Sequence, residues 1–253
     1  MIKKYIIDLN NIMGQSKYLK RFNENCLMHG FKKQKEANAI AVGGMISTGK
    51  STIVERLAKC FGFEPIYELS DDPNDLMNIL LDKMYQREPI ANSVCQLHFL
   101  LNRFKLYKQS IMNPTIKKTR VFDRTIFEDR LFAFHNMLDE PSVYEYYEKL
   151  WKEQVNQLVY EIGTPKLYII LEVTWEKFLE RLYKRNRSIE IKNFKKNENY
   201  FKLLNSGYVK YLTSICATYR IPYITVDATN KTINQEIDFI KNKLHIMKII
   251  NKK

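Results

Sequence analysis

The residues Gly44-Met45-Ile46-Ser47-Thr48-Gly49-Lys50-Ser51 match the Gly-x-x-x-x-Gly-Lys-Ser/Thr pattern of a phosphate-binding loop. An apolar run, Ala39 to Val42, precedes the pattern as a predicted strand, and Ser51 to Cys60 follows it as a predicted helix. In such a loop the glycines let backbone N–H groups surround phosphate oxygens, the lysine reaches the outer phosphates, and the serine hydroxyl can hold Mg²⁺. The helix N-terminus faces the same anion. We therefore expect the loop, through Thr52, to bind a nucleotide.

The composition fits one globular domain. The chain has 253 residues, 45% of them hydrophobic, which is enough to bury the core of a single α/β domain. Lys and Arg total 41 against 28 Asp and Glu, which gives a net charge of +13, but the basic residues are scattered rather than gathered into a long tract. This pattern favours a solvated basic surface over a nucleic-acid site.

The sequence also favours a reducing, cytoplasmic location. The four cysteines are far apart and form no zinc motif. No apolar run approaches the roughly 18 residues of a membrane span, and Asp8 interrupts the N-terminal run Tyr5 to Ile7 before a signal-peptide core can form. We expect no membrane partner.

Strand-like runs alternate with longer helical patterns, which predicts a parallel sheet covered by helices on both faces. The longest helical patterns cover 91–111 and 142–161, and their apolar faces, such as Val94 to Tyr107 and Tyr146 to Leu158, are interpreted as core or subunit contacts. Residues 1–36 are interpreted as an N-terminal extension of unknown role, followed by one domain over 37–248. The predicted strands are Ala39 to Val42, Pro65 to Tyr67, Thr119 to Phe122, Leu167 to Leu171 and Tyr223 to Val226.

Charged residues follow the predicted strands at the edge where ligands of parallel sheets bind. Glu68 follows the second strand, and Asp123 and Arg124 end the third. A carboxylate beside a neutral hydroxyl can accept its proton, while arginine and Mg²⁺ disperse charge on a transferring phosphoryl group. A basic cluster at the end of a later helix, followed by the polar stretch Ser188 to Asn199, is typical of a lid over phosphates or of a solvated helix C-terminus. Its members are Arg181, Lys184, Arg185 and Arg187.

In their order and spacing these residues resemble the deoxynucleoside kinase family, especially its bacterial deoxyadenosine and deoxyguanosine kinases. The resemblance runs from about Ala39 to Leu244 and includes the segment Tyr85 to Arg103 and the lid Arg185 to Glu190. It implies an α/β fold of the P-loop kinase type, in three layers, with a parallel five-stranded sheet flanked by helices and an arginine-rich lid. It also implies ATP with Mg²⁺ as donor, a deoxynucleoside as acceptor, and a homodimer formed through the two long helices.

The resemblance assigns roles to the matching residues. It implies Glu68 as general base, Arg124 near the 5′-oxygen and phosphates, and Ser51 with Asp123 around Mg²⁺. Donor phosphates would be held by Lys50, Arg181, Arg185 and Arg187. The sugar 3′-hydroxyl would be bound by Tyr85 and Glu190, and the base by Gln96, with Arg103 and Asp129 as the charged pair of members that accept purine deoxynucleosides or deoxycytidine.

Several alternatives stay open at this point. Gln96 and Arg103 share a helical face and could form a polar patch, Tyr85 could be a core residue, and Glu128 and Asp129 could act only as helix N-terminal charges. His98 and His135 are interpreted as structural. Cys95 and Ile189 depart from the family pattern, and no tryptophan follows Glu68, so the base preference is open. The competing functions are a thymidylate-type nucleoside monophosphate kinase and a nucleic-acid-binding or regulatory P-loop module.

Overall fold

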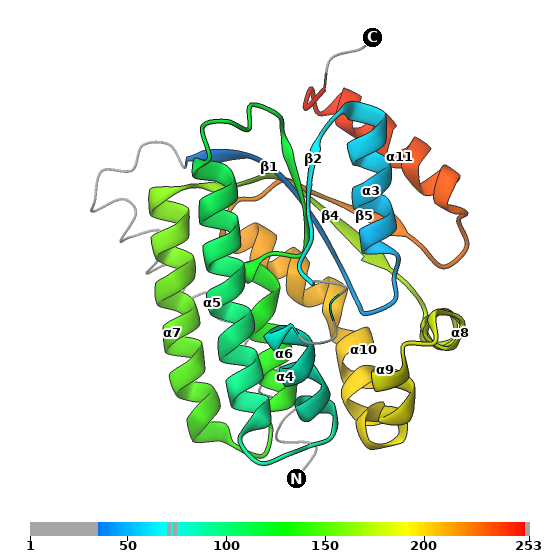
Figure 1. The fold of residues 1–253 in the computed structure, drawn as a ribbon. Coiled ribbons are helices and arrows are strands. Elements are labelled where there is room, and N and C mark those ends of the chain that lie inside the picture. The colour runs from blue at the N-terminus through cyan, green and yellow to red at the C-terminus, as the bar shows by residue number, and fades with distance from the viewer. Residues whose placement is uncertain (1–34, 70–71, 73–74, 251–253) are drawn as a thin grey trace.

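The computed structural model describes residues 35–69, 72 and 75–250, and Figure 1 shows their arrangement. The predicted N-terminal extension therefore lies outside the described residues, apart from its last two positions. In the described part, β1 begins at Glu36, close to the predicted start of the domain.

A parallel sheet forms the centre of the molecule, with the strand order β2-β3-β1-β4-β5. All five predicted strands are confirmed. They are β1 (Glu36–Gly44), β2 (Glu64–Ile66), β3 (Arg120–Asp123), β4 (Thr164–Glu172) and β5 (Tyr223–Asp227). The apolar residues Ala39 to Val42 and Leu167 to Ile170 are 0% exposed, as expected for central strands covered on both faces.

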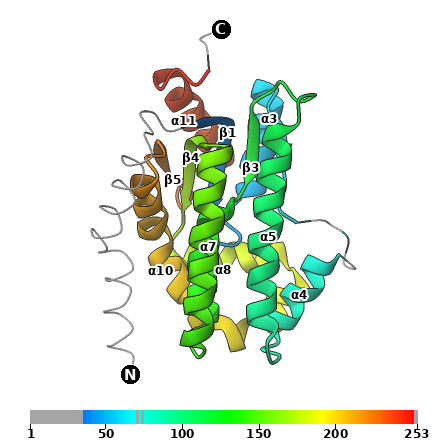
Figure 2. The same cartoon turned by 90° about the vertical axis from the view of Figure 1, so that its left-hand side faces the viewer.

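Helices cover both faces of the sheet, so the molecule has three layers (Figure 1). One face carries α3 (Lys50–Phe61) and α11 (Ile233–Ile246), which contact each other. The opposite face carries α5 (Ala91–Met112), α6 (Asp129–Asn136), α7 (Pro141–Glu161) and α10 (Phe194–Thr218). In Figure 2, α5 and α7 lie side by side on the surface that faces the viewer.

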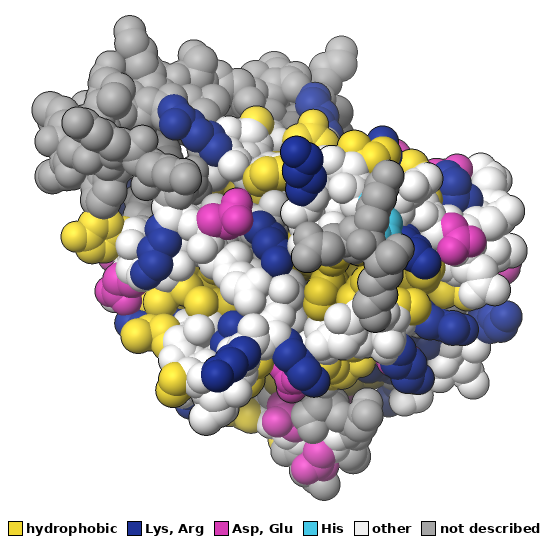
Figure 3. Space-filling model, turned by 90° about the horizontal axis from the view of Figure 1, so that it is seen from above, with side chains coloured by type: hydrophobic (Ala, Val, Ile, Leu, Met, Phe, Trp, Pro, Cys, Tyr) yellow, Lys and Arg dark blue, Asp and Glu magenta, His cyan; other side chains and the backbone are white. Residues whose placement is uncertain are grey.

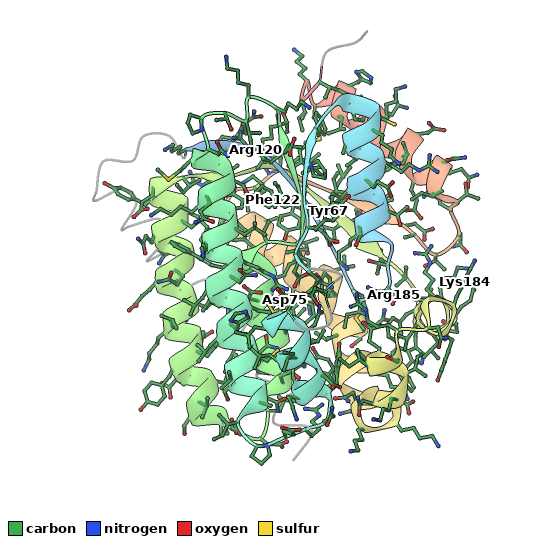
Figure 4. All side chains as sticks on the ribbon, viewed as in Figure 1. Tyr67, Asp75, Arg120, Phe122, Lys184 and Arg185 are labelled. Atoms are coloured by element: carbon green, nitrogen blue, oxygen red, sulfur yellow. The ribbon has the colours of Figure 1, made fainter. Side chains whose placement is uncertain are left out.

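Shorter elements gather beyond the carboxyl ends of the strands. They are α4 (Leu76–Tyr85), the 3-10 turn η1 (Ile126–Glu128), α8 (Trp175–Arg185) and α9 (Ser188–Lys192). In Figure 4, Arg120 at the start of β3 and Arg185 on α8 mark the two ends of the sheet. The phosphate-loop pattern and the predicted lid therefore share the end marked by Arg185.

The two long helices predicted over 91–111 and 142–161 are confirmed as α5 and α7, but the prediction that they are the longest is wrong. The longest described helix is α10, with 25 residues against 22 in α5 and 21 in α7. The polar stretch Ser188 to Asn199, predicted to belong to a lid, includes the start of this helix, where Phe194 is buried while the neighbouring lysines face solvent. Tyr200 and Phe201, in the next turn, are also buried. The polar residues of this stretch thus lie on one face of an amphipathic helix.

The predicted apolar faces of the two long helices divide between core and surface. On α7, Trp151, Val155 and Leu158 are buried, but Tyr146 is 72% exposed. On α5, Leu101 is 54% exposed and the buried face instead carries polar residues that the site uses. Among the described helices, none combines the length and apolar composition that a membrane crossing requires.

Candidate active site

The phosphate-loop residues form a tight turn between β1 and α3. Gly49 has φ 96°, a left-handed geometry that glycine adopts without steric cost. Ser47, with φ 60°, also lies in the left-handed region. Lys50 begins α3, and its Nζ donates to the carbonyl oxygen of Met45 at 3.0 Å. The hydroxyl of Ser47 is buried without a hydrogen-bond partner. These groups lie where the pattern predicts an anion cradle.

Lys50 is almost fully buried at 8% exposure. Burial, followed by the positive charge of Arg124, lowers the pKa of Lys50 to about 8, although nearby carboxylates partly oppose the shift. An anionic ligand in the cradle would favour the charged ammonium and raise this pKa again. Binding of an anion beside Lys50 would therefore be coupled to the protonation of Lys50.

Ser51 and Asp123 meet where α3 begins beside the end of β3. The Ser51 hydroxyl donates to Oδ2 of Asp123 at 2.5 Å, while Oδ1 of Asp123 is buried without a partner. A hydroxyl and a carboxylate with a free oxygen suit a hard cation such as Mg²⁺, which prefers oxygen ligands. The predicted metal residues thus lie together and their chemistry fits the ion.

Glu68 follows β2 and points toward two guanidinium groups. It forms ion pairs with Arg103, from α5, and with Arg124, whose Nε lies 3.3 Å from its Oε2. Burial raises the pKa of Glu68, but Arg103 and Arg124 together outweigh burial, so the net shift is downward. The carboxylate is therefore ionised at neutral pH, as a proton acceptor must be.

The predicted base-reading residues also come together. Arg103 pairs with Asp129 at the start of α6 as well as with Glu68. Asp129 is 0% exposed and stands behind Arg103, so it supports the pocket rather than lining it. Nε2 of Gln96 lies 3.4 Å from Sδ of Met84, and Gln96 is 2% exposed. The polar side of α5 therefore faces the site and is not a surface patch.

The predicted sugar-binding residues close the far side of this region. Tyr85 ends α4, is 2% exposed, and has its pKa raised by burial and by the charge of Glu190. Glu190 on α9 lies 3.7 Å from Nη1 of both Arg185 and Arg187. The lid arginines are thus turned toward the site, and Glu190 stands between them and Tyr85.

Arg181 lies closer to the phosphate loop than the other lid arginines. Its Nη1 donates to the carbonyl oxygen of Thr48 at 2.7 Å, and its Nη2 donates to that of Ala228 at 2.6 Å. Arg181 therefore ties the loop to the segment after β5. Burial raises the pKa of the neighbouring Glu236 to about 6, against the opposing charge of Arg181.

One cavity of about 600 Å³ connects these groups. Its volume is in the range of small-molecule sites. The polar residues that line it include Lys50, Ser51, Glu68, Tyr85, Gln96, Arg103, Asp123, Arg124, Arg181, Arg185, Arg187 and Glu190. Of the predicted residues, Gly44, Met45, Thr48 and Asp129 do not line it. Sequence reasoning missed its apolar walls, which are Leu69, Leu81, Met84, Phe99, Phe132 and Tyr200.

Comparison with known proteins identifies the family. Residues 40–252 match the family model described as deoxynucleoside kinase. The chain belongs to this family. The resemblance seen in the sequence is thereby confirmed, and with it the P-loop kinase fold. The family also decides against the two competing classes, the thymidylate-type kinase and the P-loop binding module.

Individual relatives agree with the family. A deoxyadenosine kinase of Dictyostelium discoideum is 30% identical over 87% of this chain and 84% of its own length. An uncharacterized protein of Mycoplasma pneumoniae is 43% identical over 87% of this chain and 94% of its own. The structure of deoxyadenosine kinase from M. mycoides with bound dCTP has a TM-score of 0.66 and 25% identity, covering 82% of this chain and 99% of that one. The chain is therefore a deoxynucleoside kinase, with ATP as the phosphate donor that the family implies.

Proposed function

We propose that this kinase transfers the γ-phosphoryl group of ATP to the 5′-hydroxyl of a purine deoxynucleoside, deoxyadenosine or deoxyguanosine, within the domain 37–248. The observation that carries the proposal is the buried pair of Arg103 and Asp129 beside Gln96. A buried charged pair is costly unless it meets polar groups of a ligand, such as the edge of a base. Deoxycytidine is a second acceptor with suitable polar groups.

In this proposal Glu68 starts the reaction. It is ionised, and it accepts the proton of the 5′-hydroxyl as the hydroxyl oxygen bonds to the γ-phosphorus and the bond to ADP breaks. The two guanidinium groups beside Glu68 are themselves paired with Asp129 and Glu128. This charge balance suits a neutral acceptor better than one that already carries a phosphate.

Positive groups around the cavity stabilise the transferring phosphoryl group. Lys50 and Arg124 line the cavity beside the phosphate cradle, and Arg185 and Arg187 line it from the lid. Cations placed in a partly buried site act strongly on charge that spreads over phosphate oxygens. Arg181 supports the cradle through the carbonyl oxygen of Thr48.

Magnesium belongs to the proposal through Ser51 and Asp123, which would hold it. The unpartnered Oδ1 of Asp123 is the observation that fits the ion. When bound there, Mg²⁺ would neutralise charge on the donor phosphates. Tyr85 and Glu190 would hold the sugar 3′-hydroxyl and so orient the 5′-hydroxyl toward Glu68.

The proposed assembly is a homodimer. Large apolar side chains are exposed on α5 and α7, including Val94 at 43%, Leu101 at 54% and Tyr160 at 65%. The two helices lie side by side in Figure 2. A large exposed apolar surface is typical of a protein interface. By contrast, the face shown in Figure 3 carries dispersed Lys and Arg side chains with Asp and Glu among them. The proposal includes no nucleic-acid partner.

The proposed location is the cytoplasm, where a reducing medium suits the free thiols of Cys60, Cys95 and Cys216.

A competition assay tests the acceptor. The protein is incubated with ATP, Mg²⁺ and equal concentrations of deoxyadenosine, deoxyguanosine, deoxycytidine and thymidine, and the products are separated by chromatography. We expect the monophosphate of deoxyadenosine or deoxyguanosine to form first. Preferential formation of thymidine monophosphate would refute the purine assignment. A parallel reaction with the four deoxynucleoside monophosphates as acceptors should give no product above background.

A further inference from the structure

A buried carboxylate and a buried phenol lie behind Arg124. Glu128 is 1% exposed and Tyr208 is 2% exposed, and neither lines the cavity. The proposed reaction uses only the charge of Glu128, which balances that of Arg124, and does not use Tyr208. Buried polar groups are retained at a cost unless their hydrogen bonds are satisfied, so the partners of these two groups indicate what they do.

The Tyr208 hydroxyl joins three parts of the site. It donates to Oε2 of Glu128, accepts from Nη1 of Arg124 at 2.7 Å, and accepts from the backbone N–H of Gly44 at 3.2 Å. Burial raises the pKa of Tyr208 well above its usual value, so the hydroxyl keeps its proton at neutral pH. One hydrogen and two lone pairs are the full capacity of a hydroxyl, and all are used.

Glu128 receives donors at both of its oxygens. Oε2 accepts from Nη1 of Arg124 at 2.8 Å, and Oε1 accepts from the hydroxyl of Tyr168 at 2.5 Å. The Tyr168 hydroxyl also lies 2.9 Å from Oγ1 of Thr125, the residue after Arg124. Glu128 is therefore held by β4 and α10 while it holds the arginine.

Gly43 provides the space for this network. It stands just before the phosphate-loop pattern, which does not require a glycine there. A Cβ atom at this position would lie 2.7 Å from Cε1 of Tyr168 and 3.1 Å from Oε1 of Glu128. Both contacts are tighter than packed side chains tolerate without movement. The absence of a side chain lets the network pack directly against β1.

The backbone of Arg124 is held in an uncommon conformation. Its φ is 69°, in the left-handed region, and its N–H donates to the carbonyl oxygen of Val42 on β1 at 3.0 Å. Its guanidinium then points in two directions, with Nε toward Glu68 and Nη1 toward Glu128 and Tyr208. Because the guanidinium is planar, fixing Nε and Nη1 also fixes the direction of Nη2.

We propose that Tyr208 and Glu128 are positioning residues for phosphoryl transfer, which hold Arg124 in register with the start of the phosphate loop. The inference rests on the proposed function, in which Arg124 stabilises the transferring phosphoryl group. The Tyr208 hydroxyl bonds to both the guanidinium of Arg124 and the N–H of Gly44, so the distance between these two groups is fixed. Such preorganisation contributes to the rate because the groups need not move as charge develops.

The test is Tyr208→Phe, which removes the hydroxyl and keeps the ring. We expect kcat for the preferred deoxynucleoside to fall about tenfold while its KM changes less than about twofold. Tyr211→Phe is the matched control, because Tyr211 lies on the same helix and its buried hydroxyl donates to the carbonyl oxygen of Phe127 at 3.1 Å. Its kcat should stay within about twofold of the unaltered protein. Glu128→Gln should reproduce the fall in kcat, and circular dichroism melting shows that each variant is folded.

A double variant separates positioning from a merely structural role. On an Arg124→Lys background, the guanidinium that Tyr208 holds is gone, so Tyr208→Phe should change the residual kcat less than about twofold. A persistent tenfold loss on that background would overturn the inference, as would an unchanged kcat in Tyr208→Phe alone. Full turnover in Arg124→Lys would instead overturn the proposed role of Arg124, and the inference with it. Loss of turnover in Arg124→Lys without loss in Tyr208→Phe would overturn the inference alone.

Discussion

Arg103 on α5 forms a buried ion pair with Glu68, the carboxylate that follows β2. The same guanidinium pairs with Asp129, so one side chain links the proposed general base to the proposed base-reading residues. Arg103 is 6% exposed, and its charge acts at short range with little screening by water. The residues proposed to choose the acceptor and the residue proposed to activate it are therefore coupled electrostatically.

The first prediction concerns the pH dependence of catalysis. Burial raises the pKa of Glu68, and Arg103 and Arg124 bring it below the usual 4.5. The base must be ionised, so the acid limb of kcat/KM in the unaltered enzyme should lie below about pH 4.5. In Arg103→Met, burial is less strongly opposed, and the acid limb should move to higher pH.

The measurement is kcat/KM for the deoxynucleoside from pH 4 to pH 9. The double variant Arg103→Met with Asp129→Ala is the control, because it removes the unpaired charge that the single variant leaves on Asp129. Its acid limb should also move upward. An acid limb that stays in place in both variants would show that Arg103 does not control the protonation of Glu68.

The second prediction concerns base preference. Arg103→Met together with Asp129→Ala removes the charged pair from the pocket. We expect the ratio of kcat/KM for thymidine to that for deoxyadenosine or deoxyguanosine to rise about tenfold or more. Unchanged selectivity would mean that the pair does not read the base.

The single variant Arg103→Met provides the stability control for this experiment. Asp129 is 0% exposed, so Arg103→Met leaves a buried carboxylate without its partner. Loss of one partner of a buried ion pair costs about 3–5 kcal/mol, whereas removing both costs less. Urea denaturation should therefore show the double variant to be more stable than Arg103→Met.

Much of the fold could be predicted because its signals are local. The strand from Ala39 to Val42 and the glycines of the loop are adjacent in sequence, and all five strands follow from short apolar runs. The start of α10 was not predicted, because the exposed Lys195 and Lys196 make a short stretch polar although its buried face carries Phe194 and Phe201. In a short sequence window, exposed residues count as much as buried ones.

The site could be predicted as a set of residues but not as a set of contacts. Glu68, Arg103 and Arg124 were each assigned a role, yet the ion pairs between them join segments far apart in sequence. Glu128 was considered only as a possible helix N-terminal charge, because its partners Tyr168 and Tyr208 lie 40 and 80 positions away. Such contacts depend on how α10 packs against β1, which no local pattern states.

The third prediction concerns the alkaline limb. Burial lowers the pKa of Lys50 to about 8, so in the free enzyme the ammonium loses its proton as the pH rises through this value. The neutral amine attracts phosphate less strongly, so kcat/KM for ATP should fall above about pH 8. Arginine stays protonated at these pH values, so in Lys50→Arg the remaining activity should lack this limb. An alkaline limb that is identical in both proteins would assign it to another group.

The fourth prediction concerns the assembly. Leu101 on α5 and Tyr146 on α7 are 54% and 72% exposed, so a glutamate at each position leaves the folded chain intact but places charges in the proposed interface. Light scattering after size exclusion should show a dimer for the unaltered protein and a monomer for Leu101→Glu with Tyr146→Glu. Ile246→Glu is the matched control, because Ile246 is 69% exposed on α11, and it should remain a dimer. A monomeric unaltered protein would contradict the proposed dimer.

Removal of the proton from a neutral 5′-hydroxyl by Glu68 is the central step of the proposed reaction. The most direct test is the turnover of Glu68→Gln, which keeps the size of the side chain and removes its basicity. We predict that kcat falls by about 10²-fold or more while the dissociation constant of the deoxynucleoside, measured by calorimetry, changes little. Glu64→Gln on β2, outside the cavity, should keep normal turnover. Near-normal turnover of Glu68→Gln would contradict this role of Glu68.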